Sequence, residues 1–153
     1  MNYADMDAMV AEMIALRKGK MSEEQVRLAL LASNYFGTML VKMGKADCLL
    51  GGATYSTADT IRPALQLIKT KPGSNIVSSC MIMVRGDEKL VMADCAINVD
   101  PSEDDLVEIA IESANTGKVF GIDPKVAMLS YSTLGSGKGP TVDKVANATK
   151  MIK

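Results

Sequence analysis

The sequence predicts an α/β fold: a mostly parallel or mixed sheet flanked by helices and preceded by an all-helical segment. Apolar residues recur at helical spacing through the first 44 residues, and short β-rich runs alternate with helical patterns further along the chain. Strands that alternate with helices are typical of a sheet covered by helices. We therefore expect a helical part over residues 1–45 and an α/β part over residues 46–153.

Three helices are expected in the helical part. Residues 4–17 carry methionine, valine and isoleucine on one face, which we interpret as a packing surface and not as a metal site. Ser22 has the spacing of a capping box that opens a second helix near 22–32. A third helix is expected over 34–43, with glycine at its end.

The α/β part is expected to contain strands and helices in turn, because apolar or β-rich runs are separated by glycine-containing turns and longer periodic segments. In chain order we expect a buried strand at 48–50, a helix at 57–69, the two strands of a hairpin at 76–84 and 89–94, a helix at 102–120, a strand at 125–130 and a helix at 141–152.

Composition excludes several classes of function. The chain has 153 residues, and 48% of them are hydrophobic. Its formal net charge is −1, so it has no overall electrostatic field that would attract nucleic acid or an anionic membrane. The chain has no run of about 18 apolar residues, so the sequence predicts no membrane span. The start of the chain does not have the pattern of a secretory signal, and the three cysteines have no framework spacing, so we expect a cytoplasmic protein.

The chain contains no histidine. This excludes a Ser-His-Asp triad, a Cys-His pair and any histidine metal site. Since the cysteines have no CxxC spacing and no histidine to join, a zinc site is also excluded. We expect no metal. We interpret the cysteines as core residues, and Glu103-Asp104-Asp105 as a solvated helix start that the helix dipole favours.

Two segments, Leu49–Pro63 and Met128–Gly139, share one design: an apolar run, then small polar residues with glycine, then a helix. In open α/β sheets ligands gather where strands end and helices begin, because free N–H groups point outward there. Arg62 can place a guanidinium on a phosphate or carboxylate. The alternative is that both segments are ordinary turns, which also favour serine, threonine and glycine. Neither segment is a Walker A loop or a dinucleotide fingerprint.

Four stretches of the chain resemble the phosphate acetyltransferase family and lie in the family's order. They cover almost the whole sequence and are Asn34-Tyr35-Phe36-Gly37-Thr38-Met39-Leu40-Val41, Ala46–Ala53 continued by Ser56–Gly73, Ala93-Asp94-Cys95-Ala96-Ile97-Asn98, and Val126–Thr133. Phosphate butyryltransferases are relatives, so butyryl phosphate is an alternative substrate.

The resemblance implies a fold and an assembly. The family fold is like that of isocitrate and isopropylmalate dehydrogenases, with two α/β domains, an active site between them and a homodimer formed largely through the second domain. Residues 1–45 would then be a helical remnant of the first domain and residues 46–153 most of the second. Other members extend beyond both ends, so we expect this chain to be a central fragment.

The resemblance also implies an activity: acetyl phosphate and coenzyme A are interconverted with acetyl-CoA and phosphate. Coenzyme A is a substrate in this reaction, and we expect no cofactor apart from it. Arg17 matches an arginine that binds coenzyme A phosphates, and Arg62 matches an arginine at the cleft. Further substrate-binding residues are expected in the cleft loops, namely Tyr55, Ser56, Thr57, Ser130, Ser132 and Thr133.

The departures from the family pattern are as informative. The loop that usually reads Ser-Gly-Ala-x-His reads Gly51–Tyr55 here, which removes a hydroxyl and an imidazole. The C-terminal Ser-Arg-Gly motif and the following catalytic aspartate are not found, so we assign no catalytic residue and expect little or no activity from this chain alone. The alternative function is a non-catalytic dimerisation or effector-binding module of the same fold.

Simpler interpretations of the two arginines remain open. Arg17 can serve only the C-terminal end of its helix beside the neighbouring lysines. Arg62 can simply pair with Asp59 on the same helix face.

Overall fold

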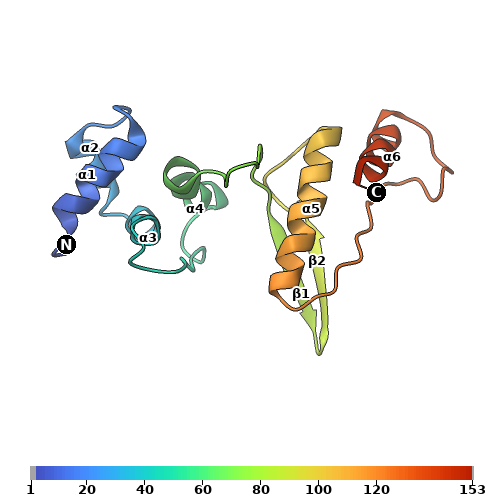
Figure 1. Cartoon of the computed structure of the whole chain (residues 1–153), viewed down its shortest axis with the longest axis horizontal. Coiled ribbons are helices and arrows are strands. Elements are labelled where there is room, and N and C mark those ends of the chain that lie inside the picture. Colours follow the sequence, from blue (N-terminus) through green and yellow to red (C-terminus); the bar gives the residue numbers. More distant parts are fainter. Residues whose placement is uncertain (1–2, 153) are drawn as a thin grey trace. The chain divides into compact units, whose positions relative to one another are not determined.

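The computed structural model describes residues 3–152, which form two compact units. The first unit is Met1–Lys71 and the second is Pro72–Lys153. In Figure 1 the first unit is drawn in blue to green and the second in yellow-green to red. Among residues 3–152, the regular structure of the first unit is all helical, while the second has a β-hairpin and two helices.

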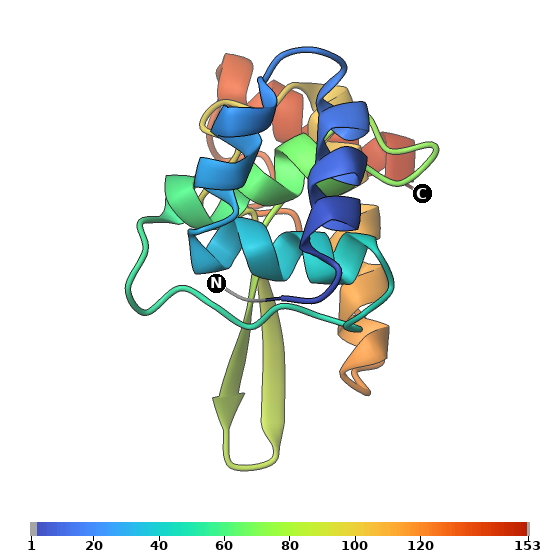
Figure 2. The same ribbon diagram turned by 90° about the vertical axis from the view of Figure 1, so that its left-hand side faces the viewer.

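The helices of the first unit pack around a core rich in methionine. The unit contains α1 (Met6–Arg17), α2 (Glu23–Ala29), α3 (Ser33–Lys42), α4 (Thr57–Pro63) and a π-helical segment η1 (Ala64–Ile68). Met9, Met13 and Met39 are completely buried, together with Leu30 and Leu67. Figure 2 looks onto these helices. The interpretation of the methionine face of α1 as packing surface is therefore confirmed.

The predicted start of α2 is confirmed. Ser22 is the N-cap, and its hydroxyl accepts the backbone N–H of Gln25 at 3.2 Å. The side chain of Gln25 accepts the N–H of Ser22 in return at 2.9 Å. Two N–H groups that a helix start leaves without intrahelical partners are thus satisfied.

The second unit is a two-stranded antiparallel sheet with two helices. Strand β1 (Cys80–Arg85) pairs with β2 (Glu88–Ala93), as the hairpin signal predicted. Helix α5 (Glu103–Val119) packs on β2 and also contacts α6 (Pro140–Ile152). Ser102 caps α5 and forms a second capping box with Asp105.

The prediction of a mostly parallel or mixed sheet is wrong for the described residues, which contain a two-stranded antiparallel sheet. Residues 48–50 form no strand, and the side chain of Leu50 is 97% exposed where a buried strand was expected. Residues 125–130 also form no strand. A strand exists only through hydrogen bonds to a neighbour, and neither segment has a partner strand in the part of the chain described. The predictions of an all-helical beginning and of helices against a sheet are confirmed.

The predicted helix over 57–69 changes type at Pro63. Proline has no backbone N–H, so it cannot donate to the carbonyl of Asp59 four residues earlier. The chain continues past Pro63 as η1, where the N–H of Lys69 donates to the carbonyl of Ala64 at 2.9 Å. The side-chain amide of Asn34, on α3, donates instead to the free carbonyl of Asp59 at 2.6 Å.

The cysteines are not core residues. Cys48 is exposed, and Cys80 and Cys95 are only half-buried. Their apolar sequence neighbours predicted burial, but the strands that were to bury them are short or not formed. Burial raises the pKa of the Cys80 thiol, and the nearby Cys95 raises it further.

Candidate functional site

Arg62 lies in the last turn of α4 and is half-exposed. Its Nη1 donates to Oδ1 of Asp59 at 2.8 Å, so the simple pairing within one helix does occur. A guanidinium has five N–H donors, and this contact uses one of them. The Nε and Nη2 groups of Arg62 have no partner among residues 3–152. The pairing therefore leaves donors for a ligand.

Ser56 is the N-cap of α4 and is also bonded to Asp59. Its hydroxyl accepts the backbone N–H of Asp59 at 3.1 Å and donates to Oδ2 of the same residue at 2.7 Å. The hydroxyl of Ser56, together with the guanidinium of Arg62, holds the pKa of Asp59 below its usual range. Asp59 is thus an ionised carboxylate shared between a helix cap and an arginine.

Tyr55 and Thr57 flank Ser56 and differ in their contacts. The hydroxyl of Tyr55 lies 2.9 Å from that of Ser33, the first residue of α3. Thr57 is the first residue of α4 and is exposed. The structure therefore places Tyr55 and Ser56 at the start of α4, and Asp59 links Ser56 to Arg62 in the last turn. Tyr55 connects the start of α4 to α3.

Arg17 ends α1 and has a buried donor. Its Nε is shielded from solvent and has no hydrogen-bond partner in the described part of the chain. A buried N–H without a partner is unfavourable, so such groups in native structures call for an explanation. The interpretation of Arg17 as a hydrogen-bonding cap for the carbonyls of α1 finds no bond to support it.

The second loop, Ser130–Gly139, is organised by bonds within itself. Ser132 Oγ accepts the N–H of Gly137 at 3.0 Å, and Ser130 Oγ accepts the N–H of Ser132 at 3.1 Å. The N–H of Thr133 donates to Ser136 Oγ at 2.9 Å. The loop leads directly into α6. The hydroxyls of Ser130 and Ser132 are therefore already occupied in shaping the loop, which the sequence pattern did not reveal.

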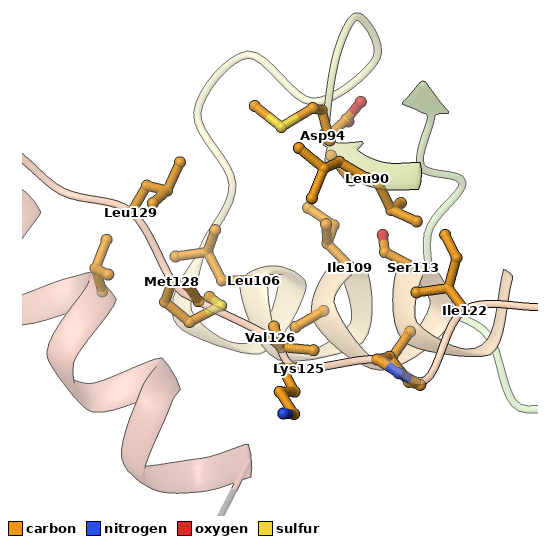
Figure 3. Close-up of a pocket in the computed structure, with 18 of the residues that line it drawn as sticks. Leu90, Asp94, Leu106, Ile109, Ser113, Ile122, Lys125, Val126, Met128 and Leu129 are labelled. Atoms are coloured by element: carbon orange, nitrogen blue, oxygen red, sulfur yellow. The ribbon is translucent and has the colours of Figure 1, made fainter. Parts of the chain in front are cut away.

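A separate cavity of about 840 Å³ lies within the second unit. Figure 3 shows it between β2, α5 and the extended segment 122–129, with Leu106, Ile109 and Val126 among its lining. None of the predicted site residues lines it. Its walls are mostly apolar side chains, bordered by the outer edge of β2 and by a segment that forms no strand, so we interpret it as the space left where a sheet lacks a strand.

Sequence reasoning missed the residues that support Arg62. Asp59 was recognised only as a partner that would occupy the arginine, and the bond from Asn34 to the Asp59 carbonyl was not foreseen. The position of Pro63, four residues after Asp59, is the signal that points to a free carbonyl there.

No group of three or more His, Cys, Asp or Glu among residues 3–152 is arranged to hold a metal ion. No described helix has both the length and the apolar character to cross a membrane.

Comparison with known proteins places these features in a family. A protein-family model described as "Phosphate acetyl/butaryl transferase" matches residues 1–153 of this chain. The phosphate acetyltransferase of Bacillus subtilis (strain 168) is 58% identical over 151 residues, which are 99% of this chain and 47% of that protein. The phosphate acetyltransferase of Staphylococcus aureus (strain Mu50) is 53% identical over 145 residues, 95% of this chain and 44% of that protein.

Two solved structures have the same fold over this region. The EutD phosphotransacetylase from Staphylococcus aureus gives a TM-score of 0.87 at 50% identity, and a phosphotransacetylase from Streptococcus pyogenes gives 0.89 at 54%. Each match covers 99% of this chain and 46% of the other. The chain thus spans about half the length of these relatives, as the expectation of a fragment required. It belongs to the phosphate acetyl/butyryl transferase family.

Proposed function

We propose that this chain supplies substrate-binding residues of an acyltransferase that interconverts acetyl phosphate and coenzyme A with acetyl-CoA and phosphate. The observation that carries the proposal is Arg62: a half-exposed guanidinium whose Nε and Nη2 donors are free among the described residues. Relatives more than 50% identical are named phosphate acetyltransferases. Arg62 lies in the stretch that resembles the family signature.

The reaction needs the kind of group that Arg62 provides. The thiol of coenzyme A gives its proton to a base, and its sulfur forms a bond to the carbonyl carbon of acetyl phosphate. The carbon–oxygen bond to phosphate breaks, and phosphate leaves with that electron pair. Negative charge develops on the carbonyl oxygen and on the leaving phosphate. A guanidinium stabilises this charge through charge-assisted hydrogen bonds. In this proposal Arg62 holds the phosphoryl group, and Tyr55, Ser56 and Thr57 line the same loop.

The remaining proposed contacts involve Arg17 and the second loop. A phosphate oxygen of coenzyme A would give the buried Nε of Arg17 the partner that it does not have among the described residues. Ser130, Ser132 and Thr133 lie in a loop that leads into α6, whose N-terminal end favours negative charge. The hydroxyls of Ser130 and Ser132 and the backbone N–H of Thr133 bond within the loop. We therefore propose that these residues shape the loop and that backbone groups meet the ligand.

The chain on its own is proposed to be inactive or nearly so. The reaction needs a base, since a thiol with a pKa near 8.5 is mostly protonated at neutral pH. The chain has no histidine, and the carboxylate beside Arg62 is a weak base because its pKa is held low. The experiment is an assay of acetyl-CoA formation from acetyl phosphate with the isolated chain. Turnover comparable to that of a complete family enzyme would contradict this part of the proposal.

The finer assignments are also proposals. We propose a homodimer through the second unit, and an exposed apolar face of the hairpin supports it, made of Met81, Met83, Leu90 and Met92. We propose a cytoplasmic location and a domain boundary near residue 45. The acyl group is proposed to be acetyl, because the named relatives are acetyltransferases, and butyryl phosphate is the alternative substrate.

The second candidate function is a dimerisation or effector-binding module without catalysis. The departures from the family loop at Gly51 and Tyr55 favour this second candidate, because the hydroxyl of Tyr55 is hydrogen-bonded to that of Ser33. Calorimetric titration with coenzyme A, alongside light scattering, separates the candidates. Binding that Arg17→Ala weakens supports the substrate-binding role. A stable dimer that binds no coenzyme A supports the module.

A further inference from the structure

The side chain of Asp59 occupies the space between a helix cap and Arg62. Its Oδ1 accepts from Nη1 of Arg62 at 2.8 Å, and its Oδ2 accepts from the hydroxyl of Ser56 at 2.7 Å. Both carboxylate oxygens are therefore used on different neighbours. Rotation of the carboxylate to serve one neighbour would break its bond to the other.

The backbone of Asp59 is fixed as well. Its N–H donates to Ser56 Oγ at 3.1 Å, and its carbonyl accepts from Asn34 Nδ2 at 2.6 Å. That carbonyl is free for Asn34 because Pro63 has no N–H to give it. Asp59 is thus held by the cap of α4 on one side and by α3 on the other, so its carboxylate is a fixed point to which a flexible arginine is tied.

An arginine side chain has several rotatable bonds, and ordering it on a ligand costs conformational entropy. A guanidinium that is already ordered loses less when it binds. The contact with Asp59 uses Nη1 and leaves Nε and Nη2 free among residues 3–152. The same contact also places a negative charge near any bound anion. Asp59 therefore either weakens anion binding through its charge or strengthens it by fixing the donors.

We propose that Asp59 is a positioning residue for Arg62: it orders the guanidinium so that Nε and Nη2 face the phosphoryl group, and this ordering outweighs the repulsion from its own charge. The inference rests on the proposed function, since it takes Arg62 as the phosphoryl ligand. It assigns Asp59 no contact with substrate and no proton transfer. Asn34 and Ser56 act through Asp59 in the same arrangement.

The sign of one mutation separates positioning from simple charge. Asp59→Ala removes one negative charge, so charge alone would tighten the binding of inorganic phosphate and acetyl phosphate several-fold, about threefold for partly solvated groups. Loss of positioning instead weakens binding, and we expect the dissociation constants of both anions to rise by about three- to tenfold. Asp59→Asn, which keeps an acceptor for Arg62, is expected to lie between Asp59→Ala and the unmodified chain.

A matched control is available on α2. Glu23 pairs with Arg27 one turn along its helix, with Nε of Arg27 at 2.8 Å, and both side chains are half-exposed or more. Glu23→Ala makes the same change in net charge in the same kind of helical ion pair, away from the residues assigned to substrate. It is expected to leave phosphate binding within the error of measurement.

The experiment follows the ¹⁵N-labelled chain by NMR, using the Nε–Hε signal of Arg62, which is identified by its loss in Arg62→Ala. Inorganic phosphate and acetyl phosphate are titrated into the unmodified chain and each variant. Order of the Nε–Hε group is measured without ligand, and both Asp59 variants are expected to make it more mobile. A substitution that only disturbs folding would move signals throughout the first unit rather than this one.

The outcomes separate the inference from the function on which it rests. No phosphate binding by the unmodified chain, or equal binding by Arg62→Ala, overturns the proposed role of Arg62 and with it the inference. Binding that Arg62→Ala weakens but that Asp59→Ala leaves equal or tighter overturns the inference alone. An Arg62 signal that stays equally ordered in Asp59→Asn also overturns it, and this readout remains if Asp59→Ala fails to fold.

Discussion

The ring of Tyr131 lies against the backbone of Gly137, so close that a Cβ at position 137 would come within 2.8 Å of the ring's Cε2. The hydroxyl of Tyr131 also donates to the carbonyl of Lys138 at 3.0 Å. The second loop is therefore closed by an aromatic ring that folds back over a glycine. This contact adds to the serine hydrogen bonds that hold the loop together.

Gly137→Ala should open this loop. The added methyl group would push the Tyr131 ring away and break its bond to Lys138, at a local cost of about 1 kcal/mol. Chemical shifts of residues 130–139 should change while those of the first unit do not. Gly51→Ala is the control, because no atom lies within 4 Å of the added Cβ there. Unchanged shifts in the loop would show that the ring does not close it.

Asn34→Ala should destabilise the first unit. The carbonyl of Asp59 would lose its half-buried donor, and Pro63 cannot replace it, so the free energy of unfolding should fall by about 1–2 kcal/mol. Urea unfolding followed by circular dichroism measures the change. Asn147→Ala is the control, because among the described residues its side chain donates only to Glu103, in a solvent-exposed bond. Equal losses in the two variants would contradict the special role of Asn34.

Asp94 should stabilise the second unit in a pH-dependent way. Burial alone would raise its pKa, but hydrogen bonds from Ser79, from the backbone N–H groups of Ala96 and Asn98 and from the Asn98 side chain outweigh burial and hold the pKa well below the usual range. Asp94→Asn replaces an acceptor with a donor facing these N–H groups. We expect a loss of about 2 kcal/mol near neutral pH, the scale of a hydrogen bond to a charged group.

The sign of the pH dependence follows from the lowered pKa. The stabilisation by Asp94 is fully present above the unfolded carboxyl's pKa of 3.8 and is lost as the pH falls below that value toward the folded pKa. The difference in stability between the unmodified chain and Asp94→Asn should therefore shrink in acid below pH 3.8. Asp123→Asn, at an exposed carboxyl outside this network, should show no such trend. A difference that is constant with pH would refute the assignment.

Residues 125–129 should exchange their amide hydrogens quickly. They form no strand, whereas the amides that join β1 to β2 are hydrogen-bonded in register from Cys80 with Ala93 to Arg85 with Glu88. We expect the bonded amides near the middle of the hairpin to exchange at least about tenfold more slowly. Hydrogen–deuterium exchange read by NMR gives both rates. Slow exchange over 125–129 would mean that this segment pairs with a strand.

Local signals in the sequence predicted local structure well. The spacing of Ser22 and Gln25 predicted the start of α2, and residues Arg85 to Glu88 predicted the hairpin turn. Both predictions succeeded because caps and tight turns depend on a few neighbouring side chains. The strands at 48–50 and 125–130 were predicted wrongly for these residues. Their apolar composition is typical of buried strands, but strand formation depends on a partner that composition cannot supply.

The candidate site was only partly readable from the sequence. The resemblance to the family made Arg62 and Ser56 candidates, and this assignment stays a prediction. The helical spacing predicted the pair of Arg62 with Asp59, which is confirmed. The sequence did not show that Asp59 also bonds Ser56 and Asn34. Asn34 is 25 residues away and contacts Asp59 only because α3 packs beside α4. Nor did the sequence show that the serines of the second loop bond within that loop.

The most direct test grafts these 153 residues into a complete relative. In this chimera they replace the matched 47% of the Bacillus subtilis phosphate acetyltransferase, and formation of acetyl-CoA from acetyl phosphate is measured. The chimera is expected to be active, and Arg62→Ala should lower kcat/KM by about 10- to 150-fold, the loss of a charged hydrogen bond of about 1.5–3 kcal/mol. Arg85→Ala, which removes a more exposed hairpin arginine that also pairs with a carboxylate three residues away, should leave it unchanged. An active chimera whose kcat/KM is the same with and without the Arg62 guanidinium would contradict the account.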